Sequence, residues 1–258
     1  MARILYDNPF SPFARKVRLV LSHKNLDYER KDSLAVSELA DLHAVNPRGE
    51  VPVLDDDGLI VVNSSDIVAY LEHRYPQPAL LPADPAVRVE ARAWERLADG
   101  LIDALTHDIS LWTWPTLQRH DQPPPGLVEA GMRDIGIVLS RLEKALDGRE
   151  YLCGSLSIAD FALFPHLTSL RALGISLQDH RNLSRWNVRM RDIPAVREDL
   201  ELVKNAVREK FVDAPSPYER EKVVWRGDRI EWLIRNGFAD WWYDELRAGR
   251  AVVPSSLE

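Results

Sequence analysis

Residues 76–85 contain four prolines and divide the chain into two parts with different hydrophobic patterns. Proline fixes its own φ angle and lacks a backbone N–H, so this segment cannot continue a regular helix or a central strand. Short apolar runs alternate with helical stretches before the segment, whereas almost no strand pattern follows it. We therefore expect an α/β domain over 1–76, a linker over 77–85 and an all-helical domain over 86–210.

In the first part, the predicted elements follow the order β-α-β-α-β-β-α. Strands are expected near residues 2–6, 26–32, 52–54 and 59–62, and helices after Ser11, over 34–43 and after Ser64. Ser11-Pro12 is a typical helix start, because a hydroxyl can cap the first turn and proline suits the first helical position. The Asp-Gly pair at 57–58 lies between two apolar runs, which predicts a β-hairpin.

The second part carries long helical stretches near residues 86–118, 126–147, 158–173 and 194–211. Ser157 and Asp160 stand at the spacing of a capping box, which marks the start of the third stretch. Residues 211–258 form an extension in which a helix is expected from about 218 to 235. Its many aromatic residues leave three roles open: stabilising packing, a lid over a substrate pocket, or a surface that binds a partner.

The composition excludes several classes of function. The 258 residues include 33 Lys and Arg against 40 Asp and Glu, and a net charge of −7 argues against nucleic acid as a partner. One cysteine, Cys153, excludes a disulfide framework and a multi-cysteine zinc site, and we expect no metal. No apolar run approaches membrane-spanning length, and the first residues lack the apolar core of a signal peptide. We therefore expect a cytoplasmic protein with no membrane partner.

Three motifs at these spacings resemble those of the glutathione transferase superfamily. They are Ser11-Pro12-Phe13, which is similar to the opening of the tau-like and omega-like classes, residues 46–54 (NPRGEVPVL), and residues 63–71 (NSSDIVAYL). The capping box at Ser157 also matches the helical domain of that family, and the resemblance covers about residues 1–210. It implies a thioredoxin-like α/β N-terminal domain joined to an all-α C-terminal domain, a homodimer, and glutathione as co-substrate.

The resemblance implies roles for the residues in these motifs. Ser11 would stabilise the glutathione thiolate, which is the nucleophile, beside the positive end of a helix; capping alone is the other interpretation. Pro52 would follow a cis peptide bond that presents the backbone of Val51 to the cysteinyl part of glutathione. Asn63 and Ser64 would bind the γ-glutamyl carboxylate at a helix N-terminus, unless they only cap that helix.

This chain departs from the family pattern at two of the implied glutathione-binding positions. Glu50 stands where many relatives carry a neutral or basic residue beside the glycyl carboxylate, and Asn63 replaces the usual acid. Phe13 completes the implied glutathione site. Serine at position 11 in place of cysteine excludes mixed disulfides, and with them thiol-reductase chemistry.

The resemblance also places one wall of an electrophile pocket on the first long helix of the second domain. His107, Trp112 and Trp114 lie there, although aromatic side chains at such spacing are also typical of a core. Tyr6 competes with Ser11 as thiol activator, because other transferase classes use a tyrosine near the end of the first strand. We expect instead that Tyr6 packs in the core or lines the pocket.

The sequence therefore predicts a serine-type glutathione transferase that joins the glutathione thiolate to a small apolar electrophile. The alternative from a different class is a non-catalytic, transferase-like scaffold that binds another protein, which Glu50 and Asn63 favour. Glutathione-dependent isomerisation or dehalogenation would use the same first domain, and the sequence does not separate them from conjugation.

Overall fold

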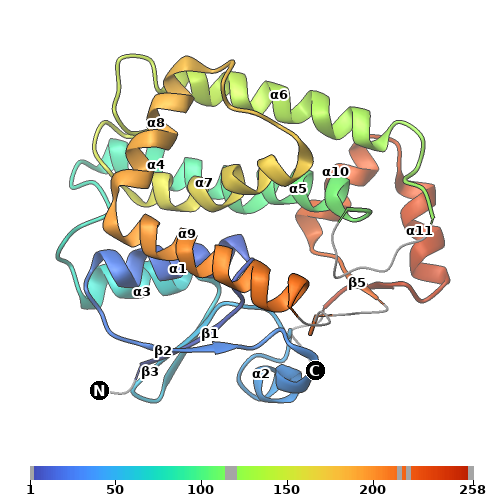
Figure 1. The fold of residues 1–258 in the computed structure, drawn as a ribbon, viewed down its shortest axis with the longest axis horizontal. Helices are drawn as coiled ribbons and strands as arrows, with labels where there is room; N and C mark the ends of the chain where they lie inside the picture. The colour runs from blue at the N-terminus through green and yellow to red at the C-terminus, as the bar shows by residue number, and fades with distance from the viewer. Residues whose placement is uncertain (1–2, 114–120, 214–216, 219–221, 255–258) are drawn as a thin grey trace.

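The computed structural model describes residues 3–113, 121–213, 217–218 and 222–254. A four-stranded mixed sheet lies at the base of the molecule in Figure 1, with strand order β2-β1-β3-β4. β1 pairs parallel with β2 and antiparallel with β3, which pairs antiparallel with β4. The elements of this N-terminal domain are β1 (Arg3–Asp7), α1 (Pro12–His23), β2 (Glu29–Asp32), the 3₁₀ turn η1 (Val36–Glu38), α2 (Leu39–Val45), β3 (Val53–Asp56), β4 (Leu59–Val62) and α3 (Ser64–Arg74).

Helix α1 lies between the sheet and the helical domain and is buried along most of its length (Figure 1). It begins where the sequence predicts, because Ser11 is the N-cap and Pro12 occupies the first helical position. Three charged residues, Arg15, Lys16 and Arg18, are buried among its apolar side chains and therefore require partners. The neighbouring helices α7 and α9 supply some of the polar partners of these charged side chains.

Ion pairs on α1 tie the two domains together. Arg15 Nη2 lies 2.8 Å from Asp199 Oδ2 on α9, and Arg18 Nη2 lies 2.7 Å from Asp199 Oδ1. Arg18 Nη1 also lies 2.6 Å from Asp7 Oδ1 at the end of β1. Burial raises the pKa of Asp7 despite the nearby Arg18. These buried contacts fix the start of α1 relative to both domains.

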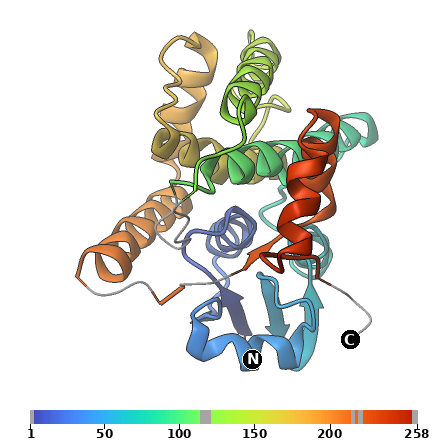
Figure 2. The same cartoon turned by 90° about the vertical axis from the view of Figure 1, so that its right-hand side faces the viewer.

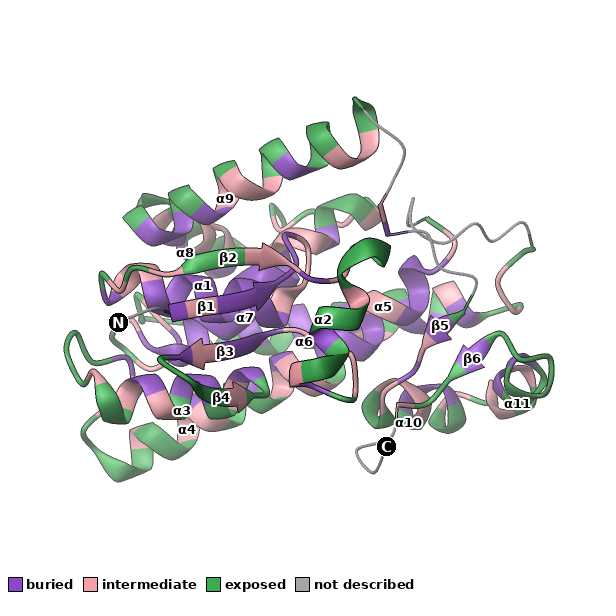
Figure 3. Cartoon of the chain, turned by 90° about the horizontal axis from the view of Figure 1, so that it is seen from below, coloured by how far each residue is buried: buried purple, intermediate pink, exposed green. Residues whose placement is uncertain are grey.

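The hairpin of β3 and β4 forms through the predicted turn. Asp57 and Gly58 both have positive φ angles, 60° and 91°, as a two-residue hairpin turn requires. β4 is an edge strand, and its apolar side chains at Leu59, Ile60 and Val62 are exposed (Figure 3). Helix α2 lies on the opposite face of the sheet from α1, as Figure 2 shows.

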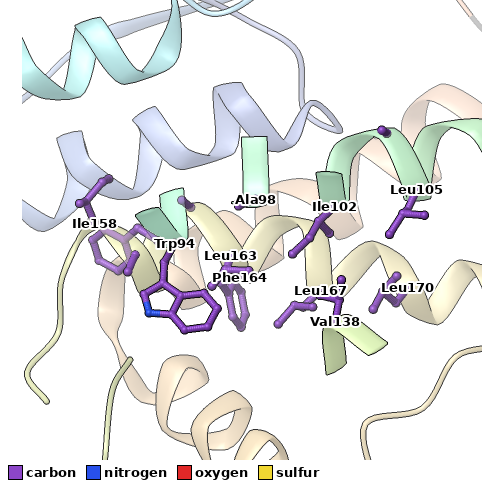
Figure 4. Packing of buried hydrophobic residues seen from close by; sticks show 14 of the residues in the cluster. Trp94, Ala98, Ile102, Leu105, Val138, Ile158, Leu163, Phe164, Leu167 and Leu170 are labelled. Carbon is purple, nitrogen blue, oxygen red and sulfur yellow. The ribbon is translucent and has the colours of Figure 1, made fainter. Parts of the chain in front are cut away.

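The second domain is all-helical, as predicted. Its elements are α4 (Pro85–Leu97), the π-helical turn η2 (Ala98–Ile102), α5 (Asp103–Ser110), α6 (Leu127–Ala145), α7 (Ile158–Ser169), the 3₁₀ turn η3 (Leu170–Leu173), α8 (Arg181–Asp192), α9 (Pro194–Val207) and the π-helical turn η4 (Arg208–Val212). Figure 4 shows its core, where Trp94 of α4 and Ile102 of η2 lie near Phe164 and Leu167 of α7.

Two details of the helical domain can be compared with the sequence prediction. The capping box is present at the start of α7, where the Asp160 carboxylate accepts a hydrogen bond from the Ser157 N–H at 3.0 Å. Helix α8 was not predicted. Only Leu183, Trp186 and Met190 of its twelve residues are buried, so its apolar stripe is narrow among many charged residues.

Residues 222–254, here called the C-terminal segment, pack beside α5 (Figure 2). They form β5 (Val223–Val224), α10 (Gly227–Arg235), α11 (Ala239–Arg247) and β6 (Ala251–Val252), and β5 pairs parallel with β6. The prediction of one helix from about 218 is therefore wrong at its start. β-branched residues at 223–224 pair with a strand far along the chain, and local composition does not reveal such a partner.

Candidate functional site

The two domains and the C-terminal segment surround a cavity of about 2110 Å³. The N-terminal domain contributes the start of α1, the loop before β3 and the start of α3, while the helical domain contributes parts of α5, η3 and α9. Residues of β5 and the start of α10 complete the lining. Eight of the residues predicted from sequence line this one cavity: Ser11, Phe13, Glu50, Val51, Pro52, Asn63, Ser64 and His107.

Ser11 is half-buried at the N-terminus of α1, and its hydroxyl caps the helix. The Oγ atom accepts a hydrogen bond from the Ala14 N–H at 3.4 Å, a long distance for such a bond. The Ser11 N–H is itself bonded to Asn8 Oδ1 at 3.2 Å, which fixes the backbone of the cap. A hydroxyl that accepts one bond keeps its own hydrogen and a second lone pair. Capping therefore leaves Ser11 able to donate a hydrogen bond into the cavity.

The loop before β3 brings Glu50, Val51 and Pro52 to the cavity, and the Val51–Pro52 bond is cis, as the resemblance implies. Glu50 forms a bidentate pair with Arg48, whose Nε and Nη2 atoms lie 2.8 Å and 3.2 Å from its carboxylate oxygens. This hydrogen bonding raises the pKa of Arg48. Arg48 also lines the cavity and donates to the carbonyl of Pro254 at 3.2 Å. A cation that the sequence did not suggest thus offsets the charge of Glu50.

The start of α3 forms the next part of the wall. Asn63 is the N-cap, with a φ of 69°, and its Oδ1 atom accepts the Ser65 N–H at 3.3 Å. Ser64, the first residue of the helix, is buried and lines the cavity. The helix terminus therefore offers backbone N–H groups and a hydroxyl to the cavity that Ser11 also lines.

A buried charge cluster holds the start of α3 in place. Lys16 Nζ lies 3.0 Å from Glu95 Oε1 and 2.5 Å from Asp99 Oδ2. The Ser65 hydroxyl bonds to the same two carboxylates, at 3.0 Å each. Burial favours the neutral acid, but the charge of Lys16 keeps the pKa of Glu95 below its usual value. α1, α3 and α4 thus meet at one cluster beside the cavity.

His107 of α5 lines the opposite wall. Its Nδ1 atom lies 3.0 Å from Asp108 Oδ1, and its ring meets the Trp225 ring edge-on, with centroids 5.4 Å apart. Burial, reinforced by the charge of Arg229, places the pKa of His107 well below its ordinary value. Burial also raises the pKa of Asp108 well above its ordinary value. Near neutral pH, His107 is therefore an uncharged imidazole.

The C-terminal segment adds two arginines to the lining. Arg229 Nε lies 2.9 Å from Asp103 Oδ2, and although burial raises the pKa of Asp103, Arg229 leaves it below its ordinary value. The guanidinium carbon of Arg226 lies 4.4 Å from the centroid of the Phe13 ring. Neither arginine was predicted as a site residue, because the segment lies far from the motifs along the chain.

Two residues for which the sequence left both a core and a pocket position open lie outside the cavity lining. Tyr6 packs with Leu42 and Val53 in a separate small cluster. Successive side chains of a strand point to opposite faces, so Leu5 meets the main core and Tyr6 faces the other way. Trp112 packs on Trp241, with ring centroids 5.8 Å apart, and does not line the cavity. The third predicted residue, Trp114, lies outside the described residues.

Residues 3–113, 121–213, 217–218 and 222–254 contain no group of three or more His, Cys, Asp or Glu side chains that could hold a metal ion. In the same part of the chain, every helix is too short or too polar to cross a membrane. Cys153 lies outside the cavity lining, and burial raises the pKa of its thiol to about 11.

Comparison with known proteins matches both halves of this arrangement. The family model of the glutathione S-transferase N-terminal domain matches residues 5–79, and that of the C-terminal domain matches residues 106–194. A probable maleylacetoacetate isomerase of Caenorhabditis elegans is 30% identical over 202 residues, which cover 74% of this chain and 90% of the relative. The chain belongs to the glutathione transferase superfamily.

Other similar proteins show how broad the likeness is. FtsZ-localized protein A of Caulobacter vibrioides is 27% identical over 203 residues, covering 76% of this chain and 89% of the relative. The crystal structure of a glutathione S-transferase from Rhodospirillum rubrum is 31% identical with a TM-score of 0.67, covering 77% of this chain and 91% of that one. In the present chain, the C-terminal segment lies beyond the residues that either family model matches.

Proposed function

We propose that this member of the glutathione transferase superfamily binds glutathione along its N-terminal domain and joins the thiolate to a small electrophile with an apolar body. The observation that carries the proposal is the convergence of Ser11, the Val51–Pro52 loop and the start of α3 on one cavity. The electrophile would occupy the part of the cavity between the helical domain and the C-terminal segment.

Each part of glutathione has a matching group on the wall. The γ-glutamyl carboxylate would lie at the start of α3, where Ser64 supplies a hydroxyl and the helix terminus favours an anion. The backbone of Val51 would pair with the cysteinyl residue in the manner of an added strand. Arg48 would balance the glycyl carboxylate, which Glu50 alone would repel. Phe13 would supply an apolar surface beside the sulfur.

Catalysis would depend on stabilising the thiolate. The Ser11 hydroxyl would donate a hydrogen bond to the sulfur, and the positive end of α1 would favour its negative charge. The thiol proton would pass to solvent. The sulfur would then form a bond to the electrophilic carbon while the leaving group departs with its electron pair. Holding both reactants close together in one cavity would supply the rest of the rate enhancement.

Two other functions are compatible with this fold. Glutathione-dependent isomerisation is supported by relatives named maleylacetoacetate isomerase, including the one from Caenorhabditis elegans. A non-catalytic scaffold is supported by the similarity to FtsZ-localized protein A. Conjugation consumes glutathione, isomerisation returns it, and a scaffold need not bind it. The glutathione balance after turnover therefore separates the three.

We also propose a homodimer in the cytoplasm. The exposed apolar residues of β4 form a surface that a second copy of the chain could cover. A reducing compartment would supply glutathione in its thiol form.

Calorimetry with glutathione tests the proposed function. We expect wild-type protein to bind glutathione, and Ser64→Ala to weaken binding by about 1–3 kcal/mol, the range for a hydrogen bond to a charged group. Ser140→Ala is the matched control, because Ser140 is exposed on α6, away from the cavity. Absence of binding to the wild-type protein would favour the scaffold. An unchanged affinity in Ser64→Ala would leave that serine with a role in the helix start alone.

A further inference from the structure

Arg226 stands out among the arginines that line the cavity. It lies in the turn between β5 and α10, and its guanidinium rests on Phe13, two positions after Ser11 on α1. Its side chain is 29% exposed, and its guanidinium makes no hydrogen bond to any residue in the described part of the chain. Its nearest acid is Asp228, with Nη2 and Oδ2 3.8 Å apart, beyond hydrogen-bond range.

Neighbouring arginines of the cavity are engaged in a different way. Arg229 binds Asp103 with two nitrogens, at 2.9 Å and 3.3 Å, and Arg15 binds Asp199 at 2.8 Å. These residues hold helices together. Arg226 lies over an aromatic face instead, a contact that leaves its N–H groups without an acceptor among the described residues.

The charge of the lining favours an anion. Ten of the described residues that line the cavity are Arg or Lys and six are Asp or Glu, whereas the whole chain has an excess of acids. On another part of the wall, Arg171 and Arg191 lie near each other without an ion pair to any described residue. Burial first, and then the charge of Arg171, lowers the pKa of Arg191. The described lining of the cavity therefore has a net positive charge, whereas the whole chain has a net negative charge.

We propose that the second substrate carries a carboxylate on its apolar body, and that Arg226 binds this group through a bidentate pair. A planar guanidinium matches a carboxylate in this geometry. The apolar body would lie beside Phe13, close to the thiolate. Arg226 would offset the repulsion between an anionic substrate and that thiolate, which grows as the two charges approach each other.

The inference rests on the proposed function for the position of the thiolate, so its test includes probes that need no reaction. 4-Nitrobenzoate and 4-nitrobenzamide differ in one group, and calorimetry gives their dissociation constants for wild type, Arg226→Gln, Arg226→Lys and Arg235→Gln. Arg235 is the matched control on α10, because its side chain is 76% exposed and lies outside the cavity lining.

We expect the wild-type protein to bind the benzoate about tenfold or more tightly than the amide, as a hydrogen-bonded charge pair provides. This preference should vanish in Arg226→Gln, persist in part in Arg226→Lys and stay intact in Arg235→Gln. With glutathione, 4-chloro-3-nitrobenzoate and 4-chloro-3-nitrobenzamide should show the same ratio in kcat/KM. Thermal unfolding of each variant tests whether it is folded. If Arg226→Gln does not fold, Arg226→Lys takes its place, and the preference should then be reduced.

The opposite outcomes are distinct. If wild type shows no preference for the benzoate while glutathione binds, the inference is wrong and the transferase proposal stands. If the preference is present and lost in Arg226→Gln but glutathione does not bind, the carboxylate site stands and the transferase proposal fails. An equal loss for both probes in Arg226→Gln would overturn the inference, because Arg226 would then support the cavity wall or the thiolate.

Discussion

The Ser11 hydroxyl caps α1, and in the proposed function it also stabilises the thiolate. We expect Ser11→Ala to lower kcat by about 10²-fold, the size of one lost hydrogen bond to a reacting anion. The glutathione dissociation constant should change little, because the contacts at Val51 and Ser64 remain. The pKa of the bound thiol should rise, and the ultraviolet absorbance of the thiolate, followed against pH, measures it.

Ser11→Thr is the control for this prediction, because it keeps both the hydroxyl and the helix cap. Loss of the cap alone in Ser11→Ala costs about 0.5–2 kcal/mol of stability, which thermal unfolding detects separately. Wild-type turnover in Ser11→Ala would mean that Ser11 only caps the helix and that another group activates the thiol.

His166 predicts a specific pH dependence of stability. It is buried on α7 with its ring edge-on to Phe13, and neither ring nitrogen has a hydrogen-bond partner among the described residues. Burial lowers its pKa to about 4. An unfolded histidine has a pKa of about 6.5, so the unfolded chain binds more protons between these values. This residue therefore lowers the free energy of unfolding as the pH falls from about 6.5 toward 4.

We expect His166→Phe to reduce the stability lost between pH 7 and pH 5 by about 2 kcal/mol relative to wild type. Urea unfolding at the two pH values measures the difference. His73→Phe, a substitution of an exposed histidine on α3, should leave the loss unchanged. The same pH dependence in wild type and His166→Phe would show that this ring does not titrate in that range.

Among the helices, α10 depends on one buried ion pair. Arg229 joins it to Asp103 at the start of α5, and both side chains are largely buried. Removing one partner of a buried pair leaves an uncompensated charge and typically costs about 3–5 kcal/mol. We expect Arg229→Gln to lower the free energy of unfolding by about this amount in chemical denaturation.

The double variant Asp103→Asn with Arg229→Gln should recover much of the loss, because no buried charge is then left alone. Arg235→Gln, on the exposed face of the same helix, should change the free energy of unfolding little. A loss in the double variant as large as in Arg229→Gln would mean that packing, and not the charge, sets the effect.

Local signals explain which elements were predictable. The caps at Ser11 and Ser157 and the turn at Asp57-Gly58 depend on neighbours a few residues away, and the structure confirms them. The pairing of β5 with β6 and the helix α8 depend on contacts far along the chain or on three buried residues among many charges. They were missed for that reason.

The residues of the site likewise divide into those that local motifs predicted and those that they did not. Part of each of the three motifs lines the cavity, because these residues lie at the start of α1, in the loop before β3 and at the start of α3. For Tyr6 the sequence left a core position and a pocket position open, and the packing of the sheet places it in the core. Arg48 and Arg226 were missed because their roles follow from pairing with Glu50 and stacking on Phe13, which no spacing indicates.

Across the whole molecule, the exposed edge strand predicts self-association. Leu59 and Ile60 are 50% and 39% exposed, and an edge of this kind favours pairing with another chain. If β4 lies in the interface of a homodimer, Leu59→Lys with Ile60→Lys should give a monomer in light scattering. Val188→Lys on α8, also at an exposed apolar position, should leave the dimer intact. A dimer that survives the double variant would place the interface elsewhere.

The cavity wall is assembled from the earliest and the latest parts of the chain, since Phe13 meets Arg226 across it. A ribosome therefore completes the N-terminal domain long before it supplies the segment that closes the cavity, and domains generally fold in order of synthesis. Until residue 226 is made, the growing chain lacks the guanidinium that lies over Phe13. We expect chaperones that hold nascent chains to contact the residues that are still exposed at that stage, and the proposed glutathione-dependent activity to begin only once the late segment has docked.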